Sequence, residues 1–169
     1  LKISDFRLKN FIDRVNLEAD EEVVQWYSRT HRFDSYDCIS CWLVDDCVIS
    51  ASFCRPYGDW YRIGQMHYTL KQYRKTHPSA MLRKDGFLDH HIHDNQDLYK
   101  GVFFSIHTYN KRMRIQSEMM HKRLINTYGE ELTSARNRIV FCGNHKLHGA
   151  DQDIFVIPYG DFDKEKFIE

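Results

Sequence analysis

The sequence lacks an excess of charge of either sign. Its 169 residues include 24 Lys and Arg and 24 Asp and Glu, so the net charge at pH 7 is zero when the histidines are neutral. A protein that binds nucleic acid mainly through electrostatic attraction carries a surplus of positive charge. The balanced composition therefore argues against a general nucleic-acid-binding protein, although it leaves room for a local basic patch.

The sequence also lacks a long apolar run. No stretch approaches the roughly 20 apolar residues that cross a membrane, and the opening LKISDFRLKN has neither the apolar block nor the cleavage site of a secretory signal. We therefore expect a cytoplasmic protein that does not bind membranes. The length suits one hydrophobic core, so we expect a single domain over residues 1–169, and the compact, aromatic-rich composition suits a bacterial or phage protein.

Cysteines are few and odd in number, which, without a secretory feature, favours reduced thiols over disulfides. Cys38 and Cys41 have C-x-x-C spacing, within a predicted strand. In a strand, residues three apart point to opposite faces, and a zinc knuckle requires a second such pair. We therefore expect structural cysteines rather than a metal site; the five are Cys38, Cys41, Cys47, Cys54 and Cys142.

The pattern of apolar residues predicts a mixed α+β fold. Runs of β-branched and aromatic residues bounded by turn residues favour strands, and apolar residues at helical spacing favour helices. We expect a central mixed, mostly antiparallel sheet of about seven strands, with parallel neighbours on either side of the second helix. The predicted strands are Lys2–Phe6, Tyr36–Val44, Cys47–Cys54, Trp60–Leu70, Gly101–His107, Arg138–Cys142 and Asp153–Pro158, and the predicted helices are Ala19–Arg32, Ser79–His91 and Asn110–Tyr128.

The segment YTLKQYRKTHPSAM, residues 68–81, leaves a predicted strand and enters a predicted helix. The first amides of a helix lack internal partners, and its dipole attracts anions, so such a loop is a natural phosphate site. Ser79 suits the helix cap and Pro78 the first turn. The segment contains no glycine, which leaves two interpretations: an anion site built on side chains, or a positively charged turn.

Two segments carry a resemblance to a known family. The order of elements, with TLKQYR (residues 69–74) and SIHTYN (residues 105–110) each leading into a helix, resembles the GNAT superfamily of N-acetyltransferases. In that family a loop of pattern Q/R-x-x-G-x-G/A binds the pyrophosphate of coenzyme A. Arg74 matches its first position, and His77 and Ser79 replace its glycines. The resemblance implies that the cofactor is held by Thr69, Leu70, Gln72, Arg74, Lys75, Thr76, His77, Ser79 and Asn110.

The resemblance further implies transfer of an acetyl group from acetyl-CoA, or of another acyl group from acyl-CoA, to a primary amine. The amine must lose a proton, and the departing thiolate must be stabilised. His67 is a candidate base, and a tyrosine is a candidate donor to the thiolate. The family commonly places that tyrosine where this chain has Gln116 and Ser117. The candidate catalytic residues are therefore His67, Tyr68, Ser105, His107 and Tyr109, with ordinary strand histidines as the alternative for His67 and His107.

The resemblance also implies that the strand at Trp60–Leu70 and the strand at Gly101–His107 splay apart to admit the pantetheine arm. Amides of that arm would pair with backbone near Tyr68 and Leu70. The acceptor is a small-molecule or protein amine, and a homodimer stays open. The loop at Asn144–Gly149 is expected to border the acceptor pocket.

Two other clusters support rival functions. The segment DHHIHD, residues 89–94, combines imidazoles and carboxylates that bind zinc, iron or manganese, although a solvated helix end is the simpler interpretation. The predicted helix over residues 111–123 is basic and rich in methionine. It supports the alternative of a catalytically inactive GNAT-like module that binds a protein or nucleic acid through this helix.

Overall fold

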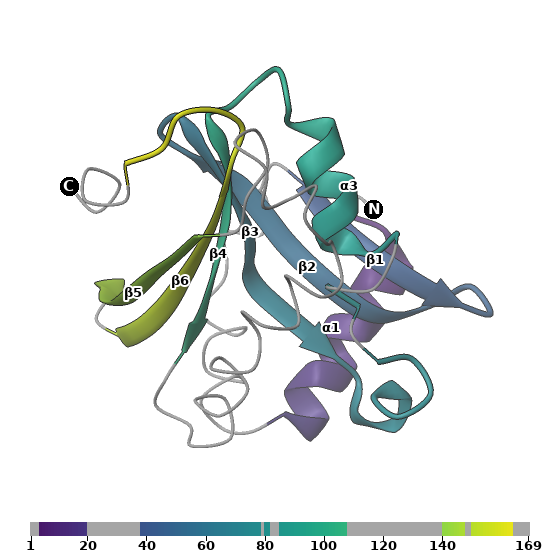
Figure 1. The fold of residues 1–169 in the computed structure, drawn as a ribbon. Helices are drawn as coiled ribbons and strands as arrows, with labels where there is room; N and C mark the ends of the chain where they lie inside the picture. Colours follow the sequence, from purple (N-terminus) through teal and green to yellow (C-terminus); the bar gives the residue numbers. More distant parts are fainter. Residues whose placement is uncertain are drawn as a thin grey trace.

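The computed structural model describes residues 4–19, 38–78, 80–81, 85–107, 140–147 and 150–163. Within these ranges a twisted sheet lies between two α-helices (Figure 1). No helix among the described residues is long and apolar enough to cross a membrane. The elements are α1 (Phe6–Glu18), β1 (Cys38–Val44), β2 (Cys47–Tyr57), β3 (Trp60–Thr69), the 3-10 turn η2 (Lys71–Tyr73), α3 (Phe87–Asp94), β4 (Gly101–His107), β5 (Val140–Leu147) and β6 (Ala150–Pro158).

The six described strands form one sheet in the order β1-β2-β3-β4-β6-β5. Every neighbouring pair is antiparallel except β3 and β4, which are parallel. The chain between these two strands includes α3, so the predicted crossover between parallel neighbours is confirmed. The predicted class, a mixed and mostly antiparallel sheet flanked by helices, is confirmed as well.

The hairpin between β1 and β2 turns at Asp45 and Asp46, as predicted. Both residues have positive φ values, 50° and 61°. A two-residue hairpin turn of this kind matches the right-handed twist of the flanking strands, and aspartate tolerates the left-handed region better than most residues. The next hairpin turns at Gly58 and Asp59, so β2 continues to Tyr57, three residues beyond the predicted end.

The first element is a helix, so the predicted strand at Lys2–Phe6 is wrong in its described part. Asp5 caps α1: its side chain accepts a hydrogen bond from the backbone amide of Arg7. Leu8, Phe11 and Val15 recur at helical spacing and are buried. The apolar stripe and the cap therefore determine a helix where the sequence analysis expected a strand and a polar connection.

The helix α3 begins at Phe87 rather than at Ser79, so the predicted start is also wrong. Gly86, which falls inside the predicted helix, is instead the N-cap residue of α3. Ala80 and Met81 lie in a turn, not in the helix. The helix then continues to Asp94, three residues past its predicted end.

The last two strands are longer than predicted and form a hairpin. β5 includes Asn144–Leu147, which the sequence analysis assigned to a loop, and β6 begins at Ala150 rather than at Asp153. Residues 148 and 149 lie outside the described ranges. The predicted helix at Asn110–Tyr128 also lies outside them, as does the predicted helix at Ala19–Arg32 except for Ala19, which is the C-cap residue of α1.

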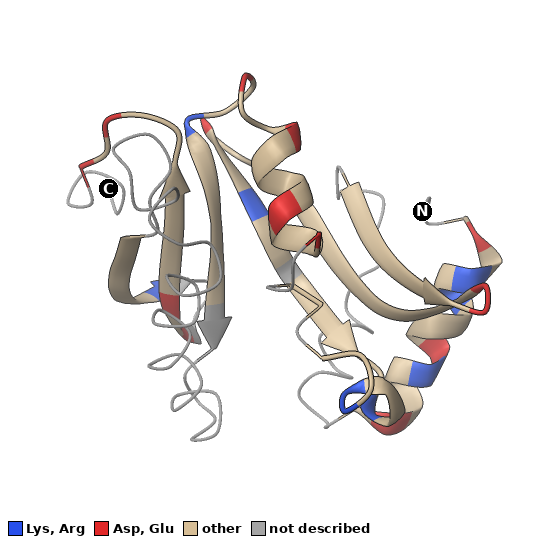
Figure 2. Cartoon of the chain, turned by 45° about the vertical axis from the view of Figure 1, so that its right-hand side comes forward, with Lys and Arg blue, Asp and Glu red and all other residues tan. Residues whose placement is uncertain are grey.

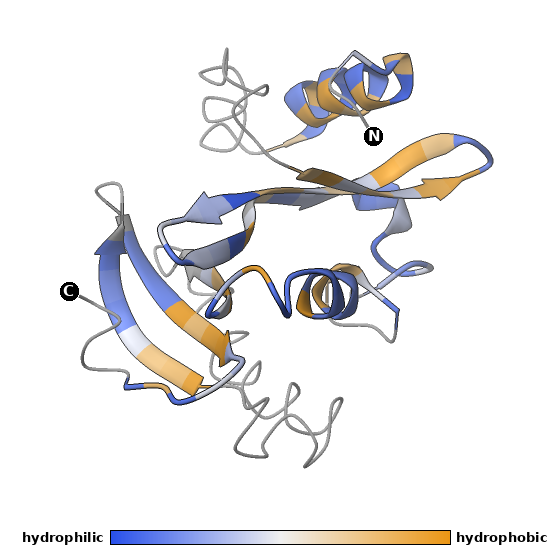
Figure 3. Cartoon of the chain, turned by 90° about the horizontal axis from the view of Figure 1, so that it is seen from above, coloured by the Kyte–Doolittle hydropathy of each residue, from blue (hydrophilic) through white to orange (hydrophobic). Residues whose placement is uncertain are grey.

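The core has two sides, separated by the sheet (Figure 3). On one side α1 packs against β1–β3, and on the other α3 packs against the strands. Cys38 packs on the α3 side and Cys41 on the α1 side, so the prediction that the two thiols diverge is confirmed. Burial raises the pKa of Cys41 to about 11, which keeps it a neutral thiol at pH 7. The five cysteines are free thiols.

Candidate functional site

The sheet opens between β3 and β4. These strands pair with each other only at Tyr61 with Val102 and at Arg62 with Phe103. Beyond these pairs β3 continues to Thr69 and β4 to His107, and the two diverge (Figure 1). The predicted splay is therefore confirmed. Beyond Arg62 and Phe103, the facing edges of the two strands do not pair with each other.

A bulge in β3 begins where the splay begins. Phe53 pairs with Met66 and Arg55 with Arg62, so the three residues 63–65 of β3 face only Cys54 of β2. Gly64, in the middle of the bulge, has a φ of +64°. Bulges bend a strand and increase its twist, which explains why β3 turns away from β4 at this point.

His67 lies on the opened part of β3 and faces α3. Its ring contacts that of Phe87 edge to face, with 5.9 Å between centroids. The side chain is partly exposed, but Nδ1 is buried and has no hydrogen-bond partner in the described part of the chain. Burial, with a smaller contribution from the charge of Arg74, lowers the pKa of His67 to about 4. The imidazole is therefore neutral at pH 7 and can accept a hydrogen bond, although it is a weak base.

Tyr68, the next residue, faces the α1 side of the sheet and is 8% exposed. The guanidinium of Arg74 lies over its ring, 4.9 Å from the centroid, and Arg74 Nε donates to the backbone oxygen of Thr69 at 2.9 Å. Arg74 thus packs the loop onto β3. His67 and Tyr68 border the opening from opposite sides of the sheet.

Ser105 lies on the other edge of the opening, in β4, and belongs to a polar network. Its hydroxyl donates to Oε1 of Gln152 at 2.6 Å and accepts from the guanidinium of Arg62 at 3.1 Å. Arg62 is 2% exposed and occupies the last position at which β3 pairs with β4. The sequence analysis missed Arg62 and Gln152. The available signal was one arginine inside the otherwise apolar start of a strand, since such a charge must be satisfied by partners.

The remaining predicted residues of the loop are arranged around η2. The hydroxyl of Thr69 is 2.8 Å from that of Ser50, and the amide of Leu70 donates to the carbonyl of Ile49 at 2.9 Å. The hydroxyl of Thr76 is 2.9 Å from Nδ1 of His77, whose ring packs edge to face with Trp42. Four predicted residues of the loop are exposed, namely Gln72, Arg74, Lys75 and Thr76.

Free amides were expected at a helix start near Ser79, but α3 begins at Phe87, and the amides of its first two residues are not free. The amides of Phe87 and Leu88 donate to the carbonyls of Ala80 and Met81, both at 3.0 Å. The carboxylate of Asp89, in the first turn, accepts from the amide of Asp85 at 2.8 Å. The first two amides of α3 are therefore already paired with the protein's own carbonyls, and the first turn of the helix carries a carboxylate.

Three predicted site residues lie outside the described ranges: Ser79, Tyr109 and Asn110. The basic helix over residues 111–123 lies outside them as well. For His107 the structure gives the backbone position alone, at the end of β4 and paired with Gln152. The structure therefore brings His67, Tyr68 and Ser105 to the borders of one opening.

The DHHIHD segment forms the last part of α3 and is divided between core and solvent. His91 is 4% exposed, and its Nε2 lies 2.8 Å from the hydroxyl of Ser40 and 3.3 Å from the sulfur of Cys54. His90 and His93 are exposed. Among the described residues no three His, Cys, Asp or Glu side chains are grouped so that they could hold a metal ion.

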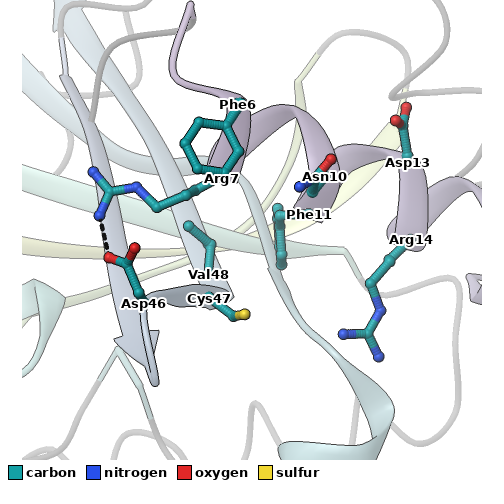
Figure 4. Close-up of a pocket in the computed structure, with 9 residues that line it drawn as sticks. All are labelled: Phe6, Arg7, Asn10, Phe11, Asp13, Arg14, Asp46, Cys47 and Val48. Carbon is teal, nitrogen blue, oxygen red and sulfur yellow. Dashed lines mark hydrogen bonds and ion pairs between the residues drawn. The ribbon is translucent and has the colours of Figure 1, made fainter.

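A groove of about 420 Å³ lies elsewhere, between α1 and the β1–β2 hairpin (Figure 4). Arg7 crosses it to form an ion pair with Asp46, with 2.6 Å between nitrogen and oxygen. None of the predicted site residues contributes to this groove. Its lining comes from Phe6, Arg7, Asn10, Phe11, Asp13, Arg14, Asp46, Cys47 and Val48.

No family model and no curated protein matches the sequence, but solved structures share its fold. The ribosomal-protein-S18-alanine N-acetyltransferase from Escherichia coli aligns with 96% of this chain and 93% of its own, with a TM-score of 0.53 and 10% identity. A GNAT-family acetyltransferase from Streptococcus pneumoniae aligns with 91% and 92%, with a TM-score of 0.52 and 14% identity. Together with the sheet order and the splay, these similarities show that the chain has a GNAT-like fold.

Proposed function

We propose that the protein is an N-acyltransferase that moves an acetyl group from acetyl-CoA, or another acyl group from acyl-CoA, to a primary amine. The observation that carries this proposal is the opening between β3 and β4 in a GNAT-like fold. Both of the solved structures compared above are described as acetyltransferases. An opening bordered by strand edges offers backbone amides and carbonyls to the amide groups of a pantetheine arm.

The bound thioester would supply an activated acyl group, and the residues of this chain would manage the proton. An amine attacks only when it is neutral. His67 is neutral at pH 7, and its buried Nδ1 has no hydrogen-bond partner among the described residues. Because its pKa is about 4, it suits a hydrogen-bond acceptor that orients the neutral amine better than it suits a strong base.

Tyr68 is the described candidate for donating a hydrogen bond to the sulfur as the acyl group leaves. It lies next to His67 in the chain, on the other side of the sheet. A ligand that contacts both residues would therefore have to reach both faces of β3. Arg62 would act indirectly, because its guanidinium fixes the hydroxyl of Ser105 on the opposite edge.

Calorimetric titration of acetyl-CoA into the full chain tests the proposal. We expect saturable binding with a dissociation constant below about 1 mM, the upper end of the usual range of enzyme KM values. Acetylation of a panel of primary amines, measured by thiol release, provides the second readout. An absence of both binding and transfer at millimolar acetyl-CoA would refute the proposed function.

The Tyr68→Phe variant tests the catalytic assignment. Loss of a general acid typically lowers the rate by a factor of about 100 or more, so we expect that fall in kcat with KM for the thioester unchanged. Tyr73→Phe is the matched control, because Tyr73 lies in η2 and packs against His77. Equal kcat values for the two variants would remove Tyr68 from the mechanism.

A further inference from the structure

The backbone amides of the first two residues of α3 already donate hydrogen bonds within the protein. In the usual phosphate site at a helix start, these amides have no partner within the protein and point at the anion. Here Phe87 and Leu88 donate instead to the carbonyls of Ala80 and Met81, each at 3.0 Å. A phosphate could reach the amides only after both backbone hydrogen bonds had broken.

The charge at this helix start is also negative. Asp89 lies in the first turn, and its Oδ2 accepts from the amide of Asp85 at 2.8 Å. A carboxylate in the first turn is stabilised by the helix dipole, so it takes the electrostatic role that a phosphate would otherwise take. Figure 2 shows acidic residues along α3 and no Lys or Arg on it.

The arginine that matches the phosphate-binding pattern is turned away from such a role. Arg74 stacks on Tyr68 and donates from Nε to the carbonyl of Thr69. These contacts attach the loop to β3. The first two amides of α3 and Nε of Arg74 thus donate to the protein's own carbonyls, and Asp89 lies at the positive end of the helix dipole.

The opening between β3 and β4 differs from the start of α3, because the two strands separate without any ligand. Positions beyond Arg62 and Phe103 do not pair with the facing strand, and the bulge around Gly64 directs β3 away from β4. Among the described residues, unpaired strand edges suited to a pantetheine arm are therefore present, whereas the start of α3 does not offer free first amides to a diphosphate.

We propose that the protein recognises its acyl donor through the pantetheine arm and the thioester, with no binding of the adenosine diphosphate end at α3. This inference rests on the proposed acyltransferase function. It defines the donor class as pantetheine thioesters. Acyl-CoA is one source of that chemistry, and an acylated phosphopantetheine group on a carrier protein is another.

Calorimetry with acetyl-CoA, S-acetylpantetheine and adenosine 3′,5′-bisphosphate tests the inference. We expect the two thioesters to bind with dissociation constants within about tenfold of each other, and the bisphosphate to displace neither. A diphosphate held by charge-assisted hydrogen bonds would make acetyl-CoA bind about 100-fold more tightly. A preference above tenfold would overturn the inference and leave the function standing, whereas failure of both thioesters to bind would overturn the function.

The Asp89→Asn variant gives an independent test on the chain itself. Asparagine keeps an oxygen that can accept from the Asp85 amide but removes the charge. We expect the ratio of the dissociation constants of acetyl-CoA and S-acetylpantetheine to stay unchanged. The control is Asp94→Asn, at the far end of the helix, for which we expect the same result. A shift of that ratio toward acetyl-CoA in Asp89→Asn alone would place the diphosphate at the helix start and overturn the inference.

Transfer rates from free S-acetylpantetheine and from an acetylated carrier protein distinguish the two sources. A faster rate from the carrier protein would assign the donor to a protein-borne arm, and equal rates would assign recognition to the shared arm alone. Both outcomes support the inference. Transfer from acetyl-CoA with none from either nucleotide-free donor would overturn it.

Discussion

The two faces of β1–β3 are buried under different helices and by different kinds of side chain. The face under α1 is apolar, with Leu8, Phe11 and Val15 packed against the strands. The face under α3 contains hydroxyls, a thiol and an imidazole, among them Ser50, Ser52 and Cys54, all fully buried. Apolar contacts stabilise in proportion to the area buried, whereas buried polar groups must each find a partner. The α1 face should therefore contribute more to the free energy of unfolding. The polar groups of the α3 face should fix the position of α3 on the sheet.

The largest expected effect comes from the α1 face. Phe11 is 1% exposed, and replacing a buried phenylalanine by alanine typically costs 3–5 kcal/mol, so we expect a loss of about 4 kcal/mol in Phe11→Ala. Urea denaturation measures this change. The control is Leu17→Ala on the same helix, 88% exposed, with an expected change within about 0.5 kcal/mol. A loss below about 1 kcal/mol in Phe11→Ala would show that α1 contributes little to the core.

An intermediate effect is expected on the α3 face. Ser40 and His91 lie 2.8 Å apart across β1 and α3, and a single hydrogen bond of this kind contributes about 1 kcal/mol. A double-mutant cycle with Ser40→Ala and His91→Gln should give a coupling of at least about 0.5 kcal/mol. Additive losses would indicate that this pair does not position α3.

The smallest expected effect is a change in pH dependence. The pKa of His67 is about 4 in the folded protein, below its ordinary value of 6.5. The unfolded chain therefore binds a proton more readily, so this group's contribution to stability is complete above pH 6.5 and falls as the pH drops toward 4. His67→Gln should lose less stability than wild type between pH 7 and pH 5. His93→Gln, an exposed site, should follow the wild-type profile, and a wild-type profile in His67→Gln would contradict the burial argument.

The strands were predictable because their patterns are local. Gly101–His107 is a continuous apolar run, and the Asp45–Asp46 turn follows from backbone preferences. The helix α1 was missed although Leu8, Phe11 and Val15 already show its spacing. The short strand-like run at the start of the chain took precedence over that longer periodicity.

The start of α3 could not be predicted, because tertiary hydrogen bonds determine it. The amide of Phe87 is satisfied by Ala80, in a turn that no local propensity specifies. For the same reason the predicted anion site, in the loop at residues 68–81, was joined to a helix start at Ser79, whereas the helix begins at Phe87. Arg62 has two partners, Ser105 in β4 and Gln152 in β6. Only the sheet order β3-β4-β6 brings these two side chains within reach of β3.

The bulge around Gly64 also means that the opening between β3 and β4 exists before a ligand binds. Because three residues of β3 face one of β2, the separation of β3 from β4 follows from the chain's own residue count and exists before any ligand arrives. Binding would then require no breaking of β3–β4 hydrogen bonds, and a preorganised site avoids the ordering cost that lowers affinity. Deleting two residues from the bulge would allow β2 and β3 to pair one to one. Such a shortened chain would be expected to keep its sheet while favouring a closed, slowly opening edge.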